Sequence, residues 1–134
     1  MAMKRWLILM TKENLAKCES GVKTQTRRDS ERLAGIKKGD QLYFRSNYKT
    51  TYATASGPYI AEEDAKWEDL QDINAYDCIR EGIPDPGFQG SQKDWISATR
   101  GAFCNLWQSI YKREGVRWED NPRVIKISFK KMTA

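Results

Sequence analysis

The sequence contains no histidine. Histidine is the side chain most often used as a general base near neutral pH, and it is the commonest ligand of zinc in proteins. Its absence excludes histidine-dependent catalytic triads, zinc deaminase sites and metal nucleases of the histidine type. Any catalysis must therefore use lysine, threonine, serine, tyrosine, cysteine or carboxylate side chains, and we expect neither a metal nor another cofactor.

Cysteine is scarce, and long apolar runs are missing. The three cysteines, Cys18, Cys78 and Cys104, are odd in number, lie far apart and form no Cys-x-x-Cys pair. The sequence shows no signal-peptide pattern, so we expect buried free thiols in a cytoplasmic protein. No apolar run approaches the roughly 18 residues that a membrane-spanning helix needs, so we expect no membrane partner.

The charge that is present is mostly positive. The 134 residues include 23 lysines and arginines against 18 acidic residues, which gives a formal net charge of +5. This balance favours a polyanionic partner, because contacts with phosphates supply most non-specific affinity for nucleic acids. The length predicts one domain spanning residues 1–134, since a domain usually has about 100–200 residues.

Hydrophobic periodicity and turn signals predict an alternation of strands and helices. Helix 12–20 has Thr11 as its N-cap and Gly21 after its last turn, and helix 75–81 has Asn74 as its N-cap. Residues 59–73 remain ambiguous, and 83–90 are expected to form a loop. The other expected elements are strands 4–10, 41–45, 49–55 and 123–131 and a long helix at 92–113. This order predicts an α+β protein, a small β-barrel that takes strands from both ends of the chain and has flanking helices.

The same patterns predict which side chains point inward. In helix 12–20 these are Leu15 and Cys18, and in the ambiguous segment Trp67 and Leu70. In the long helix, apolar residues repeat at intervals of three and four. The predicted inward positions of that helix are Trp95, Ala98, Ala102, Leu106 and Ile110, with Phe103 and Trp107 alongside.

The most informative stretch is Glu19-Ser20-Gly21-Val22-Lys23-Thr24-Gln25-Thr26-Arg27-Arg28. Arginine presents a planar fork of donors, and the pKa of lysine shifts when the side chain is buried. A threonine hydroxyl can bind a phosphate, or attack an electrophile when a base lies beside it. The stretch therefore indicates a site that binds an anion, and the alternative is a solvated basic loop after a helix.

Four separated segments resemble the ASCH family. The first is Gly21–Arg28, which resembles the family signature Gly, x, Lys, Thr, x, Thr, x, Arg. The second is Gly39-Asp40 followed by a strand. The third is Leu70-Gln71-Asp72-Ile73 with Asp77–Ile83, and the fourth is Phe103–Ile110 with Trp118–Val124; these two are similar to phage and prophage members. The segments occur in family order and span most of the chain, although 46–68 match nothing in the family pattern.

The resemblance implies a PUA-like β-barrel of the kind that commonly binds RNA or modified bases. One small bacterial ASCH protein hydrolyses the amide of N4-acetylcytidine with a lysine and a threonine of the signature and a glutamate of the later helix. Those positions correspond here to Lys23, Thr26 and Glu81. Another member has been described as a ribonuclease, but its catalytic residues correspond less clearly to positions in this sequence.

These residues suggest a consistent chemistry if the barrel brings them together. Thr26 would attack an acyl carbon, and Lys23 would act as the base once burial and neighbouring arginines lower its pKa. Glu81 would pass a proton to the departing amine or bind the edge of the base. The remaining candidate residues bind substrate: Arg27 or Arg28 would hold a phosphate or an oxyanion, and Tyr43 or Trp118 would stack on a base.

Each of these residues also has a structural interpretation. Lys23 could be a solvated loop lysine, and Thr24 and Thr26 could satisfy backbone groups in a turn. Glu81 lies in the last turn of a helix, where the helix dipole disfavours a carboxylate, and a salt bridge to Lys23 or Arg28 would explain it as well as catalysis does. Five basic residues near the C-terminus form either a solvated face or a track for nucleic acid: Arg117, Arg123, Lys126, Lys130 and Lys131.

Three functions therefore stay open. The first is an amidohydrolase that acts on an N4-acylated cytidine or a similar modified nucleoside, and the presence of Lys23, Thr26 and Glu81 favours it. The second is a binding module for RNA or a modified base that performs no chemistry. The third is a phage-type factor acting on nucleic acid, such as a ribonuclease. In all three the partner is a nucleoside or RNA.

Overall fold

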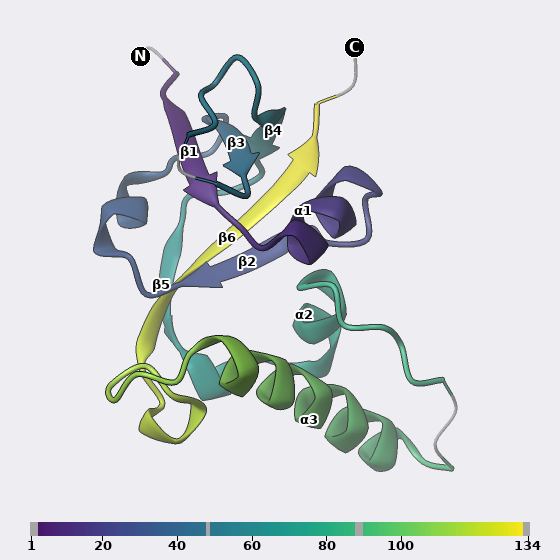
Figure 1. The fold of residues 1–134 in the computed structure, drawn as a ribbon. Helices are drawn as coiled ribbons and strands as arrows, with labels where there is room; N and C mark the ends of the chain where they lie inside the picture. The colour runs from purple at the N-terminus through teal and green to yellow at the C-terminus, as the bar shows by residue number, and fades with distance from the viewer. Residues whose placement is uncertain (1–2, 48, 88–89, 133–134) are drawn as a thin grey trace.

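The computed structural model describes residues 3–47, 49–87 and 90–132, and it confirms an α+β architecture (Figure 1). A six-stranded sheet occupies one half of the molecule and two of the three α-helices occupy the other half. In chain order the elements are β1 (Arg5–Leu9), α1 (Lys12–Glu19), β2 (Gln25–Arg28), the 3₁₀ turn η1 (Glu31–Gly35), β3 (Gln41–Arg45), β4 (Ser56–Ala61), β5 (Lys66–Asp69), the turn η2 (Leu70–Asp72), α2 (Ala75–Arg80), α3 (Gln92–Ile110), the turn η3 (Trp118–Asp120) and β6 (Arg123–Lys131).

The strand order of the sheet is β1-β3-β4-β6-β2, and β5 also pairs with β6. Strand β6 therefore pairs with three other strands. Its last residues pair with β4, and its first residues are flanked by β2 and β5, all antiparallel. β1 and β3 pair in parallel. The sheet thus curls into a partly open barrel, because in the described part of the chain no ladder of strand hydrogen bonds joins β1 to β2.

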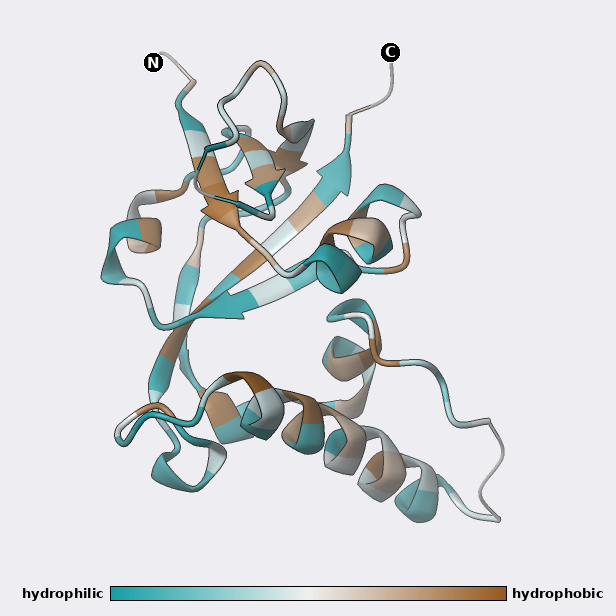
Figure 2. Cartoon of the chain, viewed as in Figure 1, coloured by the Kyte–Doolittle hydropathy of each residue, from teal (hydrophilic) through white to brown (hydrophobic). Residues whose placement is uncertain are grey.

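Alternation along β6 separates two apolar clusters, because successive side chains of a strand point to opposite faces. Figure 2 shows stretches of hydrophobic residues on β1, on the middle of β6 and along α3. The barrel core contains Ile8, Met10, Cys18, Leu33, Ile36, Leu42, Phe44, Tyr59, Ala61, Ile125, Ile127 and Phe129. The helical cluster, between α2, α3 and β6, contains Leu70, Ile73, Cys78, Ile83, Phe103, Trp107 and Val124.

Most of the predicted elements are confirmed, with two corrections among the strands. Residues 49–55 form turns instead of a strand, and the fourth strand begins only at Ser56. The basic stretch, interpreted as a loop, contains the strand β2. Local propensity missed β2 because its residues are polar, and its hydrogen bonds are supplied by β6 from about 100 residues further along. The loop at 83–90 is found where the structure describes it, and residues 88–89 lie outside the described part.

The buried face of α3 matches the prediction only in part, since Phe103 and Trp107 are buried as expected. Its fully buried residues are Thr99, Phe103 and Trp107, whereas Ala102 and Ile110 are exposed. Thr99 tolerates burial because its hydroxyl donates to the carbonyl of Trp95 at 2.8 Å. The helix also ends at Ile110, before the predicted Arg113.

Of the two residues predicted to point inward from segment 59–73, one is buried and the other is exposed. Leu70 is buried as predicted, but Trp67 is 41% exposed on the edge strand β5, with the guanidinium of Arg123 over its ring.

Cys18 and Cys78 are buried free thiols, and burial raises their pKa values to about 11 and about 12. Among the described residues, no helix is long and apolar enough to cross a membrane.

Candidate functional site

The two faces of β2 place its side chains in different surroundings. Arg27 is paired in register with Lys126, and Thr26 with Ile127. Gln25 and Arg27 therefore face α2, whereas Thr26 faces the barrel core. Gln25, Thr26 and Arg27 are all buried, so this part of the basic stretch is not a solvated loop.

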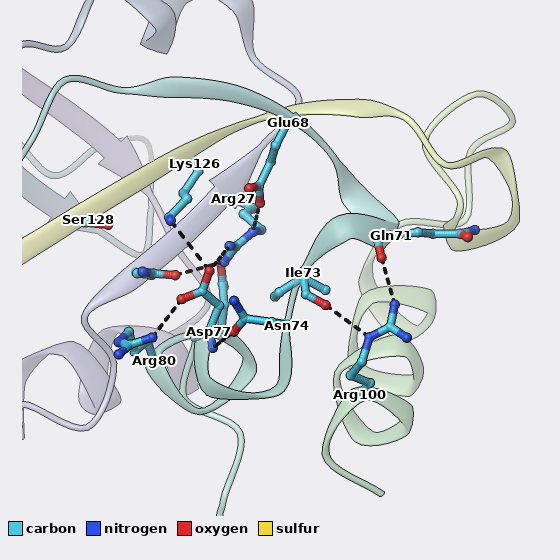
Figure 3. A network of polar contacts seen from close by, with 12 residues as sticks. Arg27, Glu68, Gln71, Ile73, Asn74, Asp77, Arg80, Arg100, Lys126 and Ser128 are labelled. Atoms are coloured by element: carbon cyan, nitrogen blue, oxygen red, sulfur yellow. Dashed lines mark hydrogen bonds and ion pairs between the residues drawn. The ribbon is translucent and has the colours of Figure 1, made fainter. Parts of the chain in front are cut away.

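Arg27 is the centre of a buried polar network between β2, β5 and α2 (Figure 3). Its side chain is 1% exposed. One terminal nitrogen donates to Glu81 Oε2 at 2.9 Å and the other to Asp77 Oδ2 at 3.0 Å. Its Nε donates to Glu68, and Gln25 Oε1 accepts a further bond at 3.1 Å. A planar guanidinium presents five donors in a fixed fork, an arrangement that the three donors of a lysine ammonium do not reproduce.

Asp77, another carboxylate of this network, is kept ionised by the basic residues around it. Burial alone would raise the pKa of Asp77, but the charges of Arg27 and Lys126 outweigh burial and lower that pKa. Arg80, on the solvent side of α2, donates to the other oxygen of Asp77 at 2.9 Å. Asn74 caps the same helix by accepting from the Asp77 backbone N–H.

Lys23 and Glu81 meet at the C-terminal end of α2. Lys23 Nζ donates to Glu81 Oε1 and to the Glu81 carbonyl oxygen, both at 2.8 Å, and the two residues are 3% and 5% exposed. Burial lowers the pKa of Lys23, and the neighbouring Glu81 carboxylate offsets only part of that effect. The position of Glu81 in the last turn is thus explained by contacts with Lys23 and Arg27, which compensate for the helix dipole.

Thr26 does not join this pair. It is fully buried, and its hydroxyl has no hydrogen-bond partner among the described residues, so neither Lys23 nor Glu81 bonds to it. The structure therefore brings together two of the three residues that the resemblance implies are catalytic. A catalytic pairing of Lys23 with Thr26 requires a rearrangement around β2.

The four predicted substrate-binding residues lie in separate places. Arg27 is enclosed in the network, and Arg28 lies at the surface near the end of β1. Tyr43 packs edge-on against Tyr52, with ring centres 5.2 Å apart. Trp118 packs against Phe103 at 6.2 Å, beside the helical cluster.

The predicted basic track is also interrupted. Arg117 forms ion pairs with Asp120 and Glu119, and Lys126 lies 3.5 Å from Asp77. Lys130 and Lys131 are exposed near the C-terminal end of β6. Three of the five residues are thus engaged by a carboxylate or a ring, Arg123 through its contact with Trp67.

A groove of about 650 Å³ lies at the open seam between β1 and β2, and we call it the seam groove. It combines an apolar floor with arginines from three segments and a tyrosine at the end of α3. Its lining residues are Leu7, Ile8, Leu9, Met10, Thr11, Asn14, Arg28, Asp29, Ser30, Arg32, Leu33, Arg45, Ser46, Ile110 and Tyr111.

Sequence reasoning identified only Arg28 among the candidate binders of the seam groove. It missed Arg32, Arg45 and Tyr111, which come from η1, β3 and the residue after α3. No local pattern joins these positions, because the tertiary fold alone places them around one groove. The described residues contain no cluster of three or more cysteine or acidic side chains that could hold a metal ion.

No protein-family model and no curated protein matches this chain. Among solved structures, the hypothetical protein PH0355 has a TM-score of 0.56 and 16% identity over 96% of this chain and 99% of its own. Protein EF3133 from Enterococcus faecalis, assigned to family model DUF984, has a TM-score of 0.54 and 12% identity over 98% and 77%. These likenesses show a shared fold.

The solved structures similar to this chain also include an ASCH domain from Lactobacillus crispatus. It has a TM-score of 0.47 and 11% identity over 93% of this chain and 79% of its own. A likeness of that strength does not place the chain in the family, and the ASCH assignment stays a prediction from the sequence motifs.

Proposed function

We propose that this chain binds a nucleoside or a short single-stranded RNA in the seam groove. The observation that carries the proposal is the composition of the groove, an apolar floor edged by three guanidinium groups and one aromatic ring. Sites for small ligands usually have about 300–1,000 Å³ and a mostly apolar lining with a few polar groups. A volume of about 650 Å³ is sufficient for one base and its sugar.

Tyr111 is the candidate platform for a base. Its ring stacks on Trp107 with centres 4.0 Å apart, so it is held in place by an aromatic neighbour that is itself buried. Its hydroxyl accepts a hydrogen bond from Arg28 at 3.4 Å. Bases stack on such rings irrespective of their identity, at about 1–3 kcal/mol for each base.

We expect Tyr111→Ala to weaken the binding of cytidine or of a short oligocytidine about tenfold or more, because the stacking surface is lost. The binding is measured by calorimetric titration at two salt concentrations. Tyr52→Ala is the matched control, since Tyr52 is a half-buried tyrosine that packs on Tyr43 and does not line the seam groove. Equal affinities of the two variants for both ligands would rule out Tyr111 as the platform.

A second candidate function is hydrolysis of an N4-acylated cytidine. Two observations favour it: the pKa of Lys23 is lowered by burial, and the buried Thr26 hydroxyl has no partner. In this mechanism a movement of β2 first brings Thr26 to Lys23, and Lys23 passes a proton to Glu81, which leaves both of these side chains neutral. The Thr26 oxygen then attacks the acyl carbon, its proton passes to Lys23, and Glu81 gives its proton to the departing amine. Water then hydrolyses the threonine ester. The phage-type and ribonuclease alternatives have no comparable observation in their favour.

The hydrolase proposal predicts that the protein releases cytidine from N4-acetylcytidine and that Thr26→Val does not. This substitution has nearly the same volume and removes only the hydroxyl, which makes no hydrogen bond in the fold. Chromatography measures the cytidine, and denaturation confirms that the variant is folded. Release by both proteins would exclude Thr26 as the nucleophile, and release by neither would leave binding as the function.

A further inference from the structure

The edge of β1 that faces away from β3 pairs with no other described strand, and two arginines bridge it. Odd-numbered residues of β1 turn their carbonyls away from β3, and two of these carbonyls accept bonds across the seam. Arg28 donates to Leu9 O at 3.1 Å, and Arg32 donates to Leu7 O at 3.2 Å. The two guanidinium groups are therefore held on consecutive outward-facing carbonyls along one wall of the seam groove.

Both guanidinium groups have donors left over. Each carries five N–H donors. Arg28 uses one terminal nitrogen on Leu9 O and the other on the Tyr111 hydroxyl, and its buried Nε has no partner among the described residues. A buried donor without an acceptor costs free energy, which a ligand oxygen can recover by accepting the bond.

The arginines also lack nearby negative charge. No carboxylate of the described residues lies within ion-pair distance of Arg28 or Arg32. Among the described residues that line the groove, Asp29 is the one acidic residue, and it is paired with Arg113 at 3.0 Å. The wall of the seam groove therefore carries uncompensated positive charge.

We propose that Arg28 and Arg32 form a phosphate subsite, so that the ligand of the seam groove is a phosphate ester of a nucleoside and not the free nucleoside. The fork of an arginine matches two phosphate oxygens, and charge-assisted bonds of this kind are about twice as strong as neutral ones. This inference rests on the proposed binding function for the identity of the base, but the anion site stands on the two arginines alone. The phosphate is either the monoester of a mononucleotide or the diester of an RNA strand.

The test is calorimetric titration with four probes: inorganic phosphate, cytidine, cytidine 5′-monophosphate and the dinucleotide cytidylyl-(3′→5′)-cytidine. We expect the monophosphate or the dinucleotide to bind at least about tenfold more tightly than cytidine, as two charge-assisted bonds predict. A preference for the monophosphate identifies a monoester, and a preference for the dinucleotide identifies a diester. Arg28→Gln and Arg32→Gln should each remove most of that advantage.

The variants are chosen so that loss of folding is not mistaken for loss of binding. Arg32 is exposed, so Arg32→Gln tests the subsite even if Arg28→Gln fails to fold. Lys66→Gln is the control, because it removes one positive charge from an exposed side chain outside the groove. It should leave all four affinities unchanged.

The outcomes separate the subsite from the proposed function. Equal binding of cytidine and its monophosphate, unaffected by Arg28→Gln and Arg32→Gln, overturns the phosphate subsite and leaves nucleoside binding intact. Phosphate binding that depends on Arg32, without any preference for a nucleotide, supports the subsite and overturns the nucleoside proposal. If no probe binds, both are overturned.

Discussion

Replacement of Arg27 by alanine is expected to lower the free energy of unfolding by about 3–5 kcal/mol, the usual cost of removing one partner from a buried ion network. The substitution leaves Asp77 and Glu81 in a buried site without the guanidinium that contacts both. Glu68 loses its arginine partner as well. Urea denaturation of the wild type and the variant measures the difference.

The controls for Arg27→Ala come from the same network. Arg80→Ala removes an arginine that also contacts Asp77, but from a side chain that is 51% exposed, so we expect at most about 1 kcal/mol. Arg27→Lys keeps the charge and should not restore stability, because one ammonium cannot reach three carboxylates on two elements. A loss from Arg27→Ala no larger than that from Arg80→Ala would show that the network does not stabilise the fold.

Replacement of Glu81 by glutamine is expected to be the second most damaging change, at about 3 kcal/mol near pH 7. Glu81 is the neighbour that raises the pKa of Lys23 against the effect of burial. Without its charge that pKa falls further, and folding then has to bury the ammonium or remove its proton. Glu119→Gln is a matched control, because Glu119 is a glutamate at the surface that is 69% exposed.

The damage from Glu81→Gln should decrease as the pH rises. Between the lowered pKa of Lys23 in the folded variant and the ordinary value of 10.5, the unfolded chain holds one more proton than the folded chain, so stability increases with pH in this interval. Denaturation of the wild type and the variant at pH 7 and pH 10 tests the sign. A difference between the two proteins that is constant, or larger at pH 10, would contradict a buried charged Lys23.

Lys23 and Glu81 are expected to stabilise the fold as well as being candidates for catalysis. Lys23 and Glu81 contribute to the buried network, so loss of activity in a variant of either one is not by itself evidence for catalysis. The Thr26 hydroxyl makes no hydrogen bond in the described fold, so Thr26→Val separates chemistry from stability more cleanly.

Local sequence signals predicted the elements whose side chains follow a period. Alternation in Arg123–Lys131 predicted β6, and the cap residues Thr11 and Asn74 predicted the starts of α1 and α2. The polar strand β2 has no such period, because one of its faces is buried against carboxylates instead of apolar side chains. Periodicity also placed the long helix correctly, but could not distinguish the face of Thr99 from that of Ala102.

The candidate site was only partly predictable for the same reason. The salt bridge between Lys23 and Glu81, one of two explanations for a carboxylate in a last helical turn, is present in the structure. The contacts of Arg27 with three acids and the gathering of Arg28, Arg32, Arg45 and Tyr111 had no signal in the chain. These groupings join residues that are up to about 80 positions apart.

The sequence by itself determined what this protein lacks and what it is built from: no histidine for acid–base chemistry, a positive charge balance and an alternation of strands and helices that specifies an α+β fold. Only the tertiary structure decided which charges are buried and which face a groove. The β2–β6 ladder turns Arg27 toward the carboxylates of α2, and the edge of β1 that no described strand pairs with leaves Arg28 and Arg32 at an open seam. The physical reason is that a strand assigns its side chains to faces only when a partner sets its register, and here that partner lies about 100 residues away.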